Sequence, residues 1–292
     1  MESVKELVEK SMSQNIPISE LMIQEECATS GASRQEVWDK MKNNLETMRA
    51  AVKRGLTGDG VYSKTGLTGG EAVLIKKYRQ EHKSLSGDAV MSAVQAAIST
   101  NEVNAAMGVV CATPTAGSAG TLPGILFMLE ERLNLSEEQM IRFLFTAGGF
   151  GMIIANKACI AGASGGCQAE VGSASAMGAA AAVEAAGGNA EQSAQALAMA
   201  ISNLLGLVCD PIAGLVELPC VKRNAIGAGN ALISADMALA GCVSKIPADE
   251  VISAMDKVGR NLPESLRETG IGGLAGTPTG QKIKMQIFGQ KV

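Results

Sequence analysis

Residues 174–186 read Ala-Ser-Ala-Met-Gly-Ala-Ala-Ala-Ala-Val-Glu-Ala-Ala and consist almost entirely of small side chains. Alanine has the highest helix propensity of all residues. A helix that is apolar on every side is normally buried, and small side chains let its neighbours approach closely. The segment therefore predicts a closely packed, buried helix.

The composition of the whole chain is consistent with tight helix packing. Of the 292 residues, 47% are apolar, only 3% are aromatic and 34 are glycine. This length allows one large domain or two smaller ones, and the apolar fraction is sufficient for a sizeable core. Side chains as small as these can also pack around a rigid buried object.

Capping boxes mark the start of three predicted helices. In such a box, the first and fourth side chains each accept a hydrogen bond from the backbone of the other. The three boxes are Ser33–Glu36, Ser136–Gln139 and Asn189–Gln192. The first precedes an apolar stripe at helical spacing, formed by Val37, Met41, Leu45, Met48 and Val52 and ended by Gly55. The third predicted helix ends at Gly206, and a fourth has Pro247 in its first turn and runs to about Arg260.

Sequence patterns typical of β-strands are nearly absent, because few segments alternate apolar and polar residues. We therefore predict an all-α fold. The composition changes near Gly55–Gly70, since residues 1–55 are charged and amphipathic whereas the remainder is rich in small residues. The predicted organisation is an N-terminal helical arm, residues 1–55, followed by a compact, small-residue-rich helical domain, residues 56–292.

Charge and hydropathy argue against two classes of partner. The net charge of −4 and the pI of about 5.3 argue against nucleic acid as the main partner. Ala147–Gly166 is the most apolar stretch, but Asn156, Lys157 and several glycines interrupt it, so we expect no membrane span. Met1–Lys10 reads as a charged helix rather than a signal sequence.

Seven cysteines in a chain without a signal sequence indicate a reducing cytoplasm. There a cysteine more often serves as a metal ligand, a nucleophile or a buried thiol than in a disulfide. Four of the seven are expected to be ordinary core or surface thiols: Cys27, Cys111, Cys159 and Cys242.

The other three cysteines, Cys167, Cys209 and Cys220, lie in loops marked by glycine or proline, 42 and 11 positions apart. This spacing is too wide for a zinc ribbon and too scattered for a disulfide framework. Predicted helices begin near Ala169 and Val221, and a helix start favours a thiolate and an anionic centre. Three thiolates on a [4Fe-4S] cluster would make such a centre, with one position left open. Spacing alone also allows three unrelated buried thiols.

Two further segments carry candidate substrate ligands. Thr113, Thr115 and Ser118 alternate with glycines in the loop 111–123, where hydroxyls and free N–H groups could hold a carboxylate. The glycine spacing does not match a phosphate-binding loop, and an ordinary turn-rich connection is the alternative.

Lys222, Arg223 and Asn224 follow Cys220 directly, so a cation and an amide lie one turn from the candidate metal site. They could orient a substrate carboxylate, or they could form a solvated helix start. The one histidine, His82, lies in a charged run, which argues against a histidine-based triad or a two-histidine zinc site.

Several long motifs together resemble the iron-sulfur-dependent L-serine dehydratases, and more narrowly the α subunit of the two-subunit form. Three of them contain the cysteines: Gly-Gly-Cys-Gln-Ala-Glu-Val-Gly (165–172), Leu-Gly-Leu-Val-Cys-Asp-Pro-Ile-Ala-Gly (205–214) and Glu-Leu-Pro-Cys-Val-Lys-Arg-Asn-Ala (217–225). The others are Asn-Glu-Val-Asn-Ala-Ala-Met-Gly (101–108), Ala-Thr-Pro-Thr-Ala-Gly-Ser-Ala-Gly (112–120) and Arg-Glu-Thr-Gly (267–270). The resemblance covers nearly the whole chain.

The resemblance implies a largely helical catalytic domain in which Cys167, Cys209 and Cys220 ligate a [4Fe-4S] cluster. One iron is then free of cysteine. Single-chain relatives reach that iron with a C-terminal cysteine, whereas this chain ends Phe-Gly-Gln-Lys-Val. We therefore expect water, hydroxide or substrate as the fourth ligand. A β chain of a different fold is also implied, so we expect a cytoplasmic α–β hetero-oligomer that is not active as the α chain alone.

The implied reaction is the conversion of L-serine to pyruvate and ammonia. The open iron would act as a Lewis acid on the substrate hydroxyl while a base removes the Cα proton. The sequence does not identify that base. The substrate-binding residues expected are Thr113, Thr115, Ser118, Lys222, Arg223 and Asn224. The alternatives are an iron-sulfur lyase acting on another hydroxy acid, and a non-catalytic helical subunit whose thiols are incidental or hold a structural zinc.

Overall fold

The computed structural model describes residues 1–289 and confirms the all-α fold. Within that range it contains thirteen α-helices and no sheet strand. The first seven are α1 (Val4–Gln14), α2 (Ile18–Ser30), α3 (Arg34–Gly55), α4 (Glu71–Glu81), α5 (Asp88–Ala105), α6 (Thr121–Leu133) and α7 (Glu137–Lys157). The others are α8 (Gly162–Gly165), α9 (Ser173–Ala185), α10 (Ala190–Asn203), α11 (Cys220–Leu239), α12 (Ala248–Asn261) and α13 (Pro278–Phe288). Residues 290–292, the last three of the chain end Phe-Gly-Gln-Lys-Val, lie outside the described residues.

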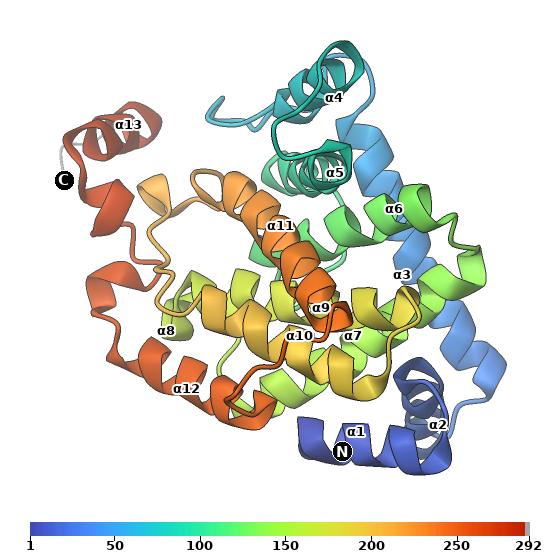
Figure 1. The fold of residues 1–292 in the computed structure, drawn as a ribbon. Helices are drawn as coiled ribbons and strands as arrows, with labels where there is room; N and C mark the ends of the chain where they lie inside the picture. Colours follow the sequence, from blue (N-terminus) through green and yellow to red (C-terminus); the bar gives the residue numbers. More distant parts are fainter. Residues whose placement is uncertain (290–292) are drawn as a thin grey trace.

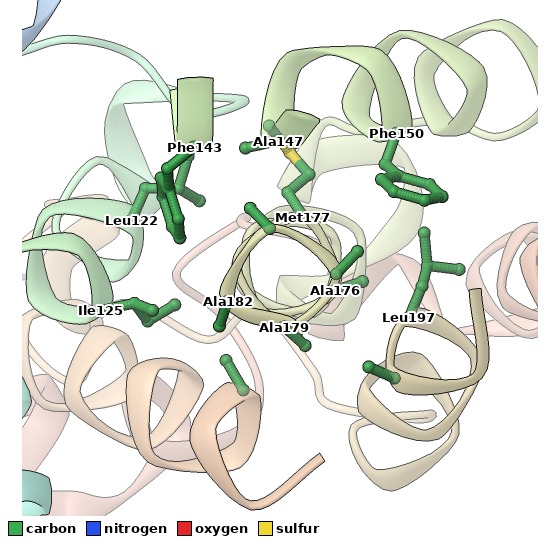
Figure 2. Packing of buried hydrophobic residues seen from close by; sticks show 14 of the residues in the cluster. Leu122, Ile125, Phe143, Ala147, Phe150, Ala176, Met177, Ala179, Ala182 and Leu197 are labelled. Carbon is green, nitrogen blue, oxygen red and sulfur yellow. The ribbon is translucent and has the colours of Figure 1, made fainter. Parts of the chain in front are cut away.

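Helix α9 is the small-residue segment, and it forms the centre of the molecule, buried along its length except at Glu184 and Ala185. Every residue from Ser173 to Val183 is buried. Figure 2 shows the helix nearly end-on, with Phe150 of α7, Ile125 of α6 and Leu197 of α10 directed at it. Its closest neighbours are α6, α7, α10 and α11. The prediction of a closely packed buried helix is confirmed.

The predicted capping boxes are all present, with both reciprocal hydrogen bonds, at the starts of α3, α7 and α10. The fourth predicted helix is α12. Its Pro247 is the N-cap residue rather than part of the first turn, and the helix ends at Asn261. Local sequence signals were therefore accurate to within a few residues at these helix starts.

The remaining helices pack around the central group (Figure 1). Helix α5 lies against α6 and α11, α3 packs on α5 and α7, and α4 covers the outer side of α5. Val4, Leu7 and Leu45, from the first 55 residues, belong to the same hydrophobic cluster as α7 and α9. The division at residue 55 stays a prediction. No helix in the described range is both long and apolar enough to span a bilayer.

Candidate functional site

The three predicted metal ligands come from three separate segments and are buried near one another. Cys167 precedes η2 (Gln168–Gly172), a short π-helix that continues directly into α9. Cys209 lies in the loop between α10 and α11, and Cys220 is the first residue of α11. Their exposed fractions are 4%, 3% and 9%. Cys167 and Cys209 pack in one buried cluster with Val171, and Arg223, three positions after Cys220, bonds to Val208 O beside Cys209.

Gln168 fixes the loop that carries Cys167. The backbone N–H of Gln168 donates to Leu207 O at 2.9 Å, and its side-chain Nε2 donates to Met255 O at 2.9 Å. Gly206 N–H donates to Gln168 Oε1 at 2.9 Å. Because these partners come from α12 and from the loop before Cys209, one buried amide ties together two of the cysteine loops.

Cys209 is held by a short extended contact with the segment that follows α12. Its N–H donates to Leu266 O at 2.9 Å, and its carbonyl accepts from Glu268 N at 2.7 Å. Glu268 has φ +63°, a left-handed conformation that non-glycine residues rarely adopt. The backbone next to Cys209 is therefore locally strained, as is common at functional sites.

Burial controls the acidity of the three thiols. It raises the pKa of Cys167 to about 12 and also raises the pKa of Cys209 and Cys220. The guanidinium of Arg223 opposes this effect at Cys167 and Cys220 but does not outweigh it. Cys167 and Cys220 do lie at helix starts, as predicted. Burial acts against the thiolate at both positions, and the expectation that a helix start favours the thiolate stays a prediction.

Arg223 is committed to a buried ion pair beside the thiols. Its Nη1 donates to Val208 O at 2.7 Å and lies 2.7 Å from Asp210 Oδ1, a contact outside hydrogen-bond geometry. Asp210 Oδ2 accepts from Leu274 N–H at 2.7 Å. The side chain of Asp210 is 4% exposed and that of Arg223 is 17% exposed. The pair thus joins the loop around Cys209 to α11.

The predicted hydroxyl loop folds back on itself around Ser118. Its Oγ donates to Thr113 O at 3.0 Å, and Thr115 N–H donates to Ser118 Oγ at 3.3 Å. By contrast, Thr113 Oγ1 is buried and has no hydrogen-bond partner in the part of the chain that the structure describes. Of the three hydroxyls, the Thr113 hydroxyl alone is left without a bond.

Glu170 lies between this loop and the thiols, and the sequence analysis did not single it out. Thr115 Oγ1 donates to Glu170 Oε1 at 2.6 Å. A Cβ added to Gly162 would lie 2.6 Å from Glu170 Oε2 and 3.0 Å from Cys209 Sγ. The carboxylate therefore approaches the thiols across a glycine that leaves room for it. Burial raises its pKa, as does the charge of Glu268, while the bond from Thr115 lowers it.

A signal for Glu170 was present in the sequence. It lies within the motif 165–172, three positions after Cys167, which is about one helical turn. That spacing places Glu170 on the same side of the helical turn as Cys167.

The two remaining predicted substrate ligands already have internal partners. Lys222 Nζ lies 2.6 Å from Glu71 Oε1 on α4, and its side chain is 56% exposed. Asn224 is fully buried, with its amide oxygen accepting from the start of α6 and its Nδ2 donating to two carbonyls. The partners of Asn224 are Gly120 N, Thr121 N, Thr121 Oγ1, Gly117 O and Cys220 O.

Asn101 on α5 is a second polar residue that the sequence analysis did not select as a ligand. It is 2% exposed, and neither Oδ1 nor Nδ2 has a hydrogen-bond partner within residues 1–289. Its Cγ lies 3.2 Å from the position that a Cβ on Gly120 would occupy. A buried amide with both groups unbonded normally costs free energy, so it marks a place where the protein alone is incomplete.

The three buried thiols suit a metal centre that takes thiolate ligands. Over the described range, no three His, Cys, Asp or Glu side chains gather closely enough to hold one metal ion. The three thiols nonetheless share one buried environment, and thiolates are the ligands that iron-sulfur clusters require. Buried thiols with a raised pKa ionise readily only where a metal supplies compensating positive charge. The three cysteines are therefore donors of the kind that an iron-sulfur cluster takes, and the metal group that they hold stays a prediction.

Comparison with known proteins gives a consistent picture. A family model described as serine dehydratase alpha chain matches residues 13–275. A "Probable L-serine dehydratase, alpha chain" of Bacillus subtilis is 60% identical over 287 residues, covering 98% of this chain and 95% of the relative. The protein of the same name from Latilactobacillus sakei is 73% identical over 70% of this chain and 97% of the relative. The "L-serine dehydratase, alpha chain" of Peptoniphilus asaccharolyticus is 45% identical, over 99% of this chain and 98% of the relative.

Proposed function

The chain belongs to the serine dehydratase alpha chain family, and on that premise we propose how its buried thiols serve the reaction. It is the catalytic subunit of an L-serine dehydratase, an enzyme of the ammonia-lyase type. Membership implies a metal or iron-sulfur cofactor in general, serine as the substrate, and a beta chain as the partner.

The finer proposal is that Cys167, Cys209 and Cys220 hold a [4Fe-4S] cluster in a cytoplasmic α–β hetero-oligomer. The observation that carries it is the packing of Cys167 with Cys209 in one buried cluster, to which Arg223 joins the start of α11, where Cys220 lies, by its bond to Val208 O. When bound, such a cluster supplies an iron with a free coordination position that can polarise the hydroxyl of L-serine. The protein alone supplies the remaining contacts.

The side chains around the thiols divide into those that bind and those that position. We assign the Thr113 hydroxyl, which has no internal partner, to the substrate carboxylate. Ser118 and Asn224 hold the hydroxyl loop and the start of α6 in place. Arg223, already paired with Asp210, lowers the negative potential around the thiols, and the exposed Lys222 contributes charge at the rim.

The reaction follows from these contacts. Loss of the Cα proton and of the hydroxyl group as water converts L-serine to aminoacrylate. Aminoacrylate tautomerises to the imine, and water then hydrolyses the imine to pyruvate and ammonia. The Cα–H bond is weakly acidic, so a bound and charge-balanced carboxylate makes its loss easier.

The decisive variant is Cys209→Ala, made in the α chain co-purified with its beta chain under strictly anaerobic conditions. We expect loss of the iron and sulfide content, of the visible absorbance, and of pyruvate formation from L-serine, because an open cluster cannot lose one of three thiolates. Cys242→Ala is the matched control, since Cys242 is exposed whereas the three proposed ligands are buried. It should retain all three properties.

A Cys209→Ala enzyme that kept both the cluster and its turnover would disprove the ligand assignment. A colourless wild-type protein with stoichiometric zinc would instead support a structural role for the thiols. Pyruvate from L-serine should be compared with 2-oxobutyrate from L-threonine in the same preparation, to measure the substrate preference.

A further inference from the structure

Glu170 has no cationic partner among the described residues. One of its oxygens, Oε1, accepts the hydrogen bond from Thr115 at 2.6 Å. Across residues 1–289, no lysine, arginine, histidine or amino terminus lies within 4.0 Å of its carboxylate. The one charged residue that acts on its pKa, Glu268, is itself an acid and raises that pKa.

The free oxygen of Glu170 is the one on the side of the thiols. Oε2 would lie 2.6 Å from a Cβ on Gly162, and Cys209 Sγ would lie 3.0 Å from the same atom. Any larger residue at position 162 would separate the carboxylate from the thiol. The geometry therefore holds one carboxylate oxygen at the edge of the proposed metal centre without using it in a bond to the protein.

The other carboxylates of the site are in a different situation. Asp210 is engaged by Arg223 and by the N–H of Leu274. Glu268 lies on the strained loop after Cys209. Glu170 is the rigid member, because its backbone belongs to η2 and its Oε1 is held by Thr115, which is in turn held by Ser118.

We infer that Glu170 Oε2 binds the α-ammonium group of the substrate. This inference rests on the proposed function and refines it, because it names the chemical feature by which the site selects its substrate. An ammonium group meets an uncompensated, partly buried carboxylate in a charge-assisted hydrogen bond. The site is therefore specific for 3-hydroxy acids that carry a 2-ammonium group, and it discriminates against hydroxy acids without one.

The arrangement also places the substrate's two charges on opposite elements of the site. The ammonium group faces η2, and the carboxylate faces the Thr113 hydroxyl on the loop before α6. Glu170 is thus a specificity-determining residue, distinct from the ligands that hold the metal centre.

The test compares the binding of two unreactive or truncated probes to the complete, cluster-loaded α–β enzyme by anaerobic equilibrium dialysis. L-Alanine has the ammonium group and no hydroxyl, whereas 3-hydroxypropanoate has the hydroxyl and no ammonium group. Glu170→Gln should weaken the binding of L-alanine by about 10- to 100-fold, the usual effect of losing a charged hydrogen bond. It should change the Kd of 3-hydroxypropanoate by less than about twofold. The KM for L-serine should rise together with the Kd of L-alanine.

Glu184→Gln is the matched control, because Glu184 lies at the far end of the same helix and bonds only to the protein. It should leave the affinity for both probes unchanged. If the Glu170→Gln enzyme does not retain iron and sulfide, the Thr115→Val variant tests the inference instead. That variant frees Oε1 but keeps the charge, so it should weaken L-alanine binding several-fold and leave 3-hydroxypropanoate binding unchanged.

Equal weakening of both probes, or no change in either, would overturn the inference. These outcomes are independent of the proposed function, which fails instead if the wild-type α–β enzyme holds its cluster and forms no pyruvate from L-serine.

Discussion

Glu170 and Glu184 lie on one continuous helical segment, yet their surroundings differ. Glu184, at the end of α9, accepts hydrogen bonds from Ile18 N at 2.8 Å and from Thr146 Oγ1 at 2.8 Å. It caps the start of α2 and needs nothing from outside the protein. Glu170, at the other end, has one bond to Thr115 and one oxygen free beside the thiols. Both oxygens of Glu184 thus accept hydrogen bonds from the protein, whereas one oxygen of Glu170 is left for a ligand.

The same contrast separates the two regions in which these residues lie. The core around α9 is closed by apolar packing, and its buried Ser175 donates to Gly227 O at 2.8 Å. The region of the thiols contains buried polar groups without partners, including Thr113 Oγ1 and both amide groups of Asn101. The hydroxyls of Ser173, Ser193 and Ser234 in the core are also buried without a partner, so the contrast lies in the amide of Asn101, whose donor and acceptor are both costly to leave unbonded.

The largest effect on the free energy of unfolding should come from truncating Glu184, whose carboxylate is fully hydrogen-bonded within the protein. Glu184→Ala leaves the N–H groups at the start of α2 and the Thr146 hydroxyl without an acceptor. We expect a loss of about 3 kcal/mol in the free energy of unfolding, because hydrogen bonds to a charged group are among the stronger ones. Denaturant titration measures it, and Glu170→Ala, expected to cost about 1 kcal/mol, is the comparison. Equal losses in the two variants would remove the distinction between the two carboxylates.

A pH effect of intermediate size should arise at Glu102, which is completely buried on α5 and accepts from Glu71 N at 2.6 Å and Ala72 N at 3.4 Å. Burial raises its pKa from 4.5 to about 7, against the opposing effect of those two N–H groups. The native state then binds more protons than the unfolded state between pH 4.5 and 7. Stability should therefore fall as the pH rises through that interval, by about 2 kcal/mol.

Glu102→Gln stays neutral at every pH and should remove most of this slope in thermal unfolding measured from pH 4.5 to 8. Glu170 also has a raised pKa and contributes in the same direction, so the variant should retain a small residual slope. A slope as steep as that of the wild type would show that Glu102 ionises normally.

The smallest change in stability should come from Thr113→Val, which removes a buried hydroxyl that has no partner. Valine has nearly the same shape, so the free energy of unfolding should stay the same or rise by up to about 1 kcal/mol. The KM for L-serine should rise several-fold if this hydroxyl meets the substrate carboxylate. Initial-rate kinetics and denaturant titration measure the two effects, and a destabilised variant with normal KM would place Thr113 in the structure rather than in the site.

Most of the helices were predictable because their signals are local. The capping boxes at Ser33, Ser136 and Asn189 each depend on residues three positions apart, and all three formed as predicted. The same locality explains why Cys167 and Cys220 were correctly expected at helix starts. Glu170 and Asn101 were not selected, because their roles depend on neighbours such as Thr115 and Gly120, which are more than fifteen positions away.

The sequence alone determined the all-α fold, the buried helix at 174–186 and the cysteine-bearing motifs that identify the family. Helix propensity, capping and motif identity are properties of neighbouring residues, so they can be read directly from the chain. The tertiary structure decided which polar groups are bonded and which are free, and it buries the thiols so that the pKa of each is raised. Desolvation and hydrogen bonding depend on segments far apart in the chain. Only the packed protein therefore reveals that Glu170 has one carboxylate oxygen beside Cys209 that accepts no hydrogen bond from the described protein.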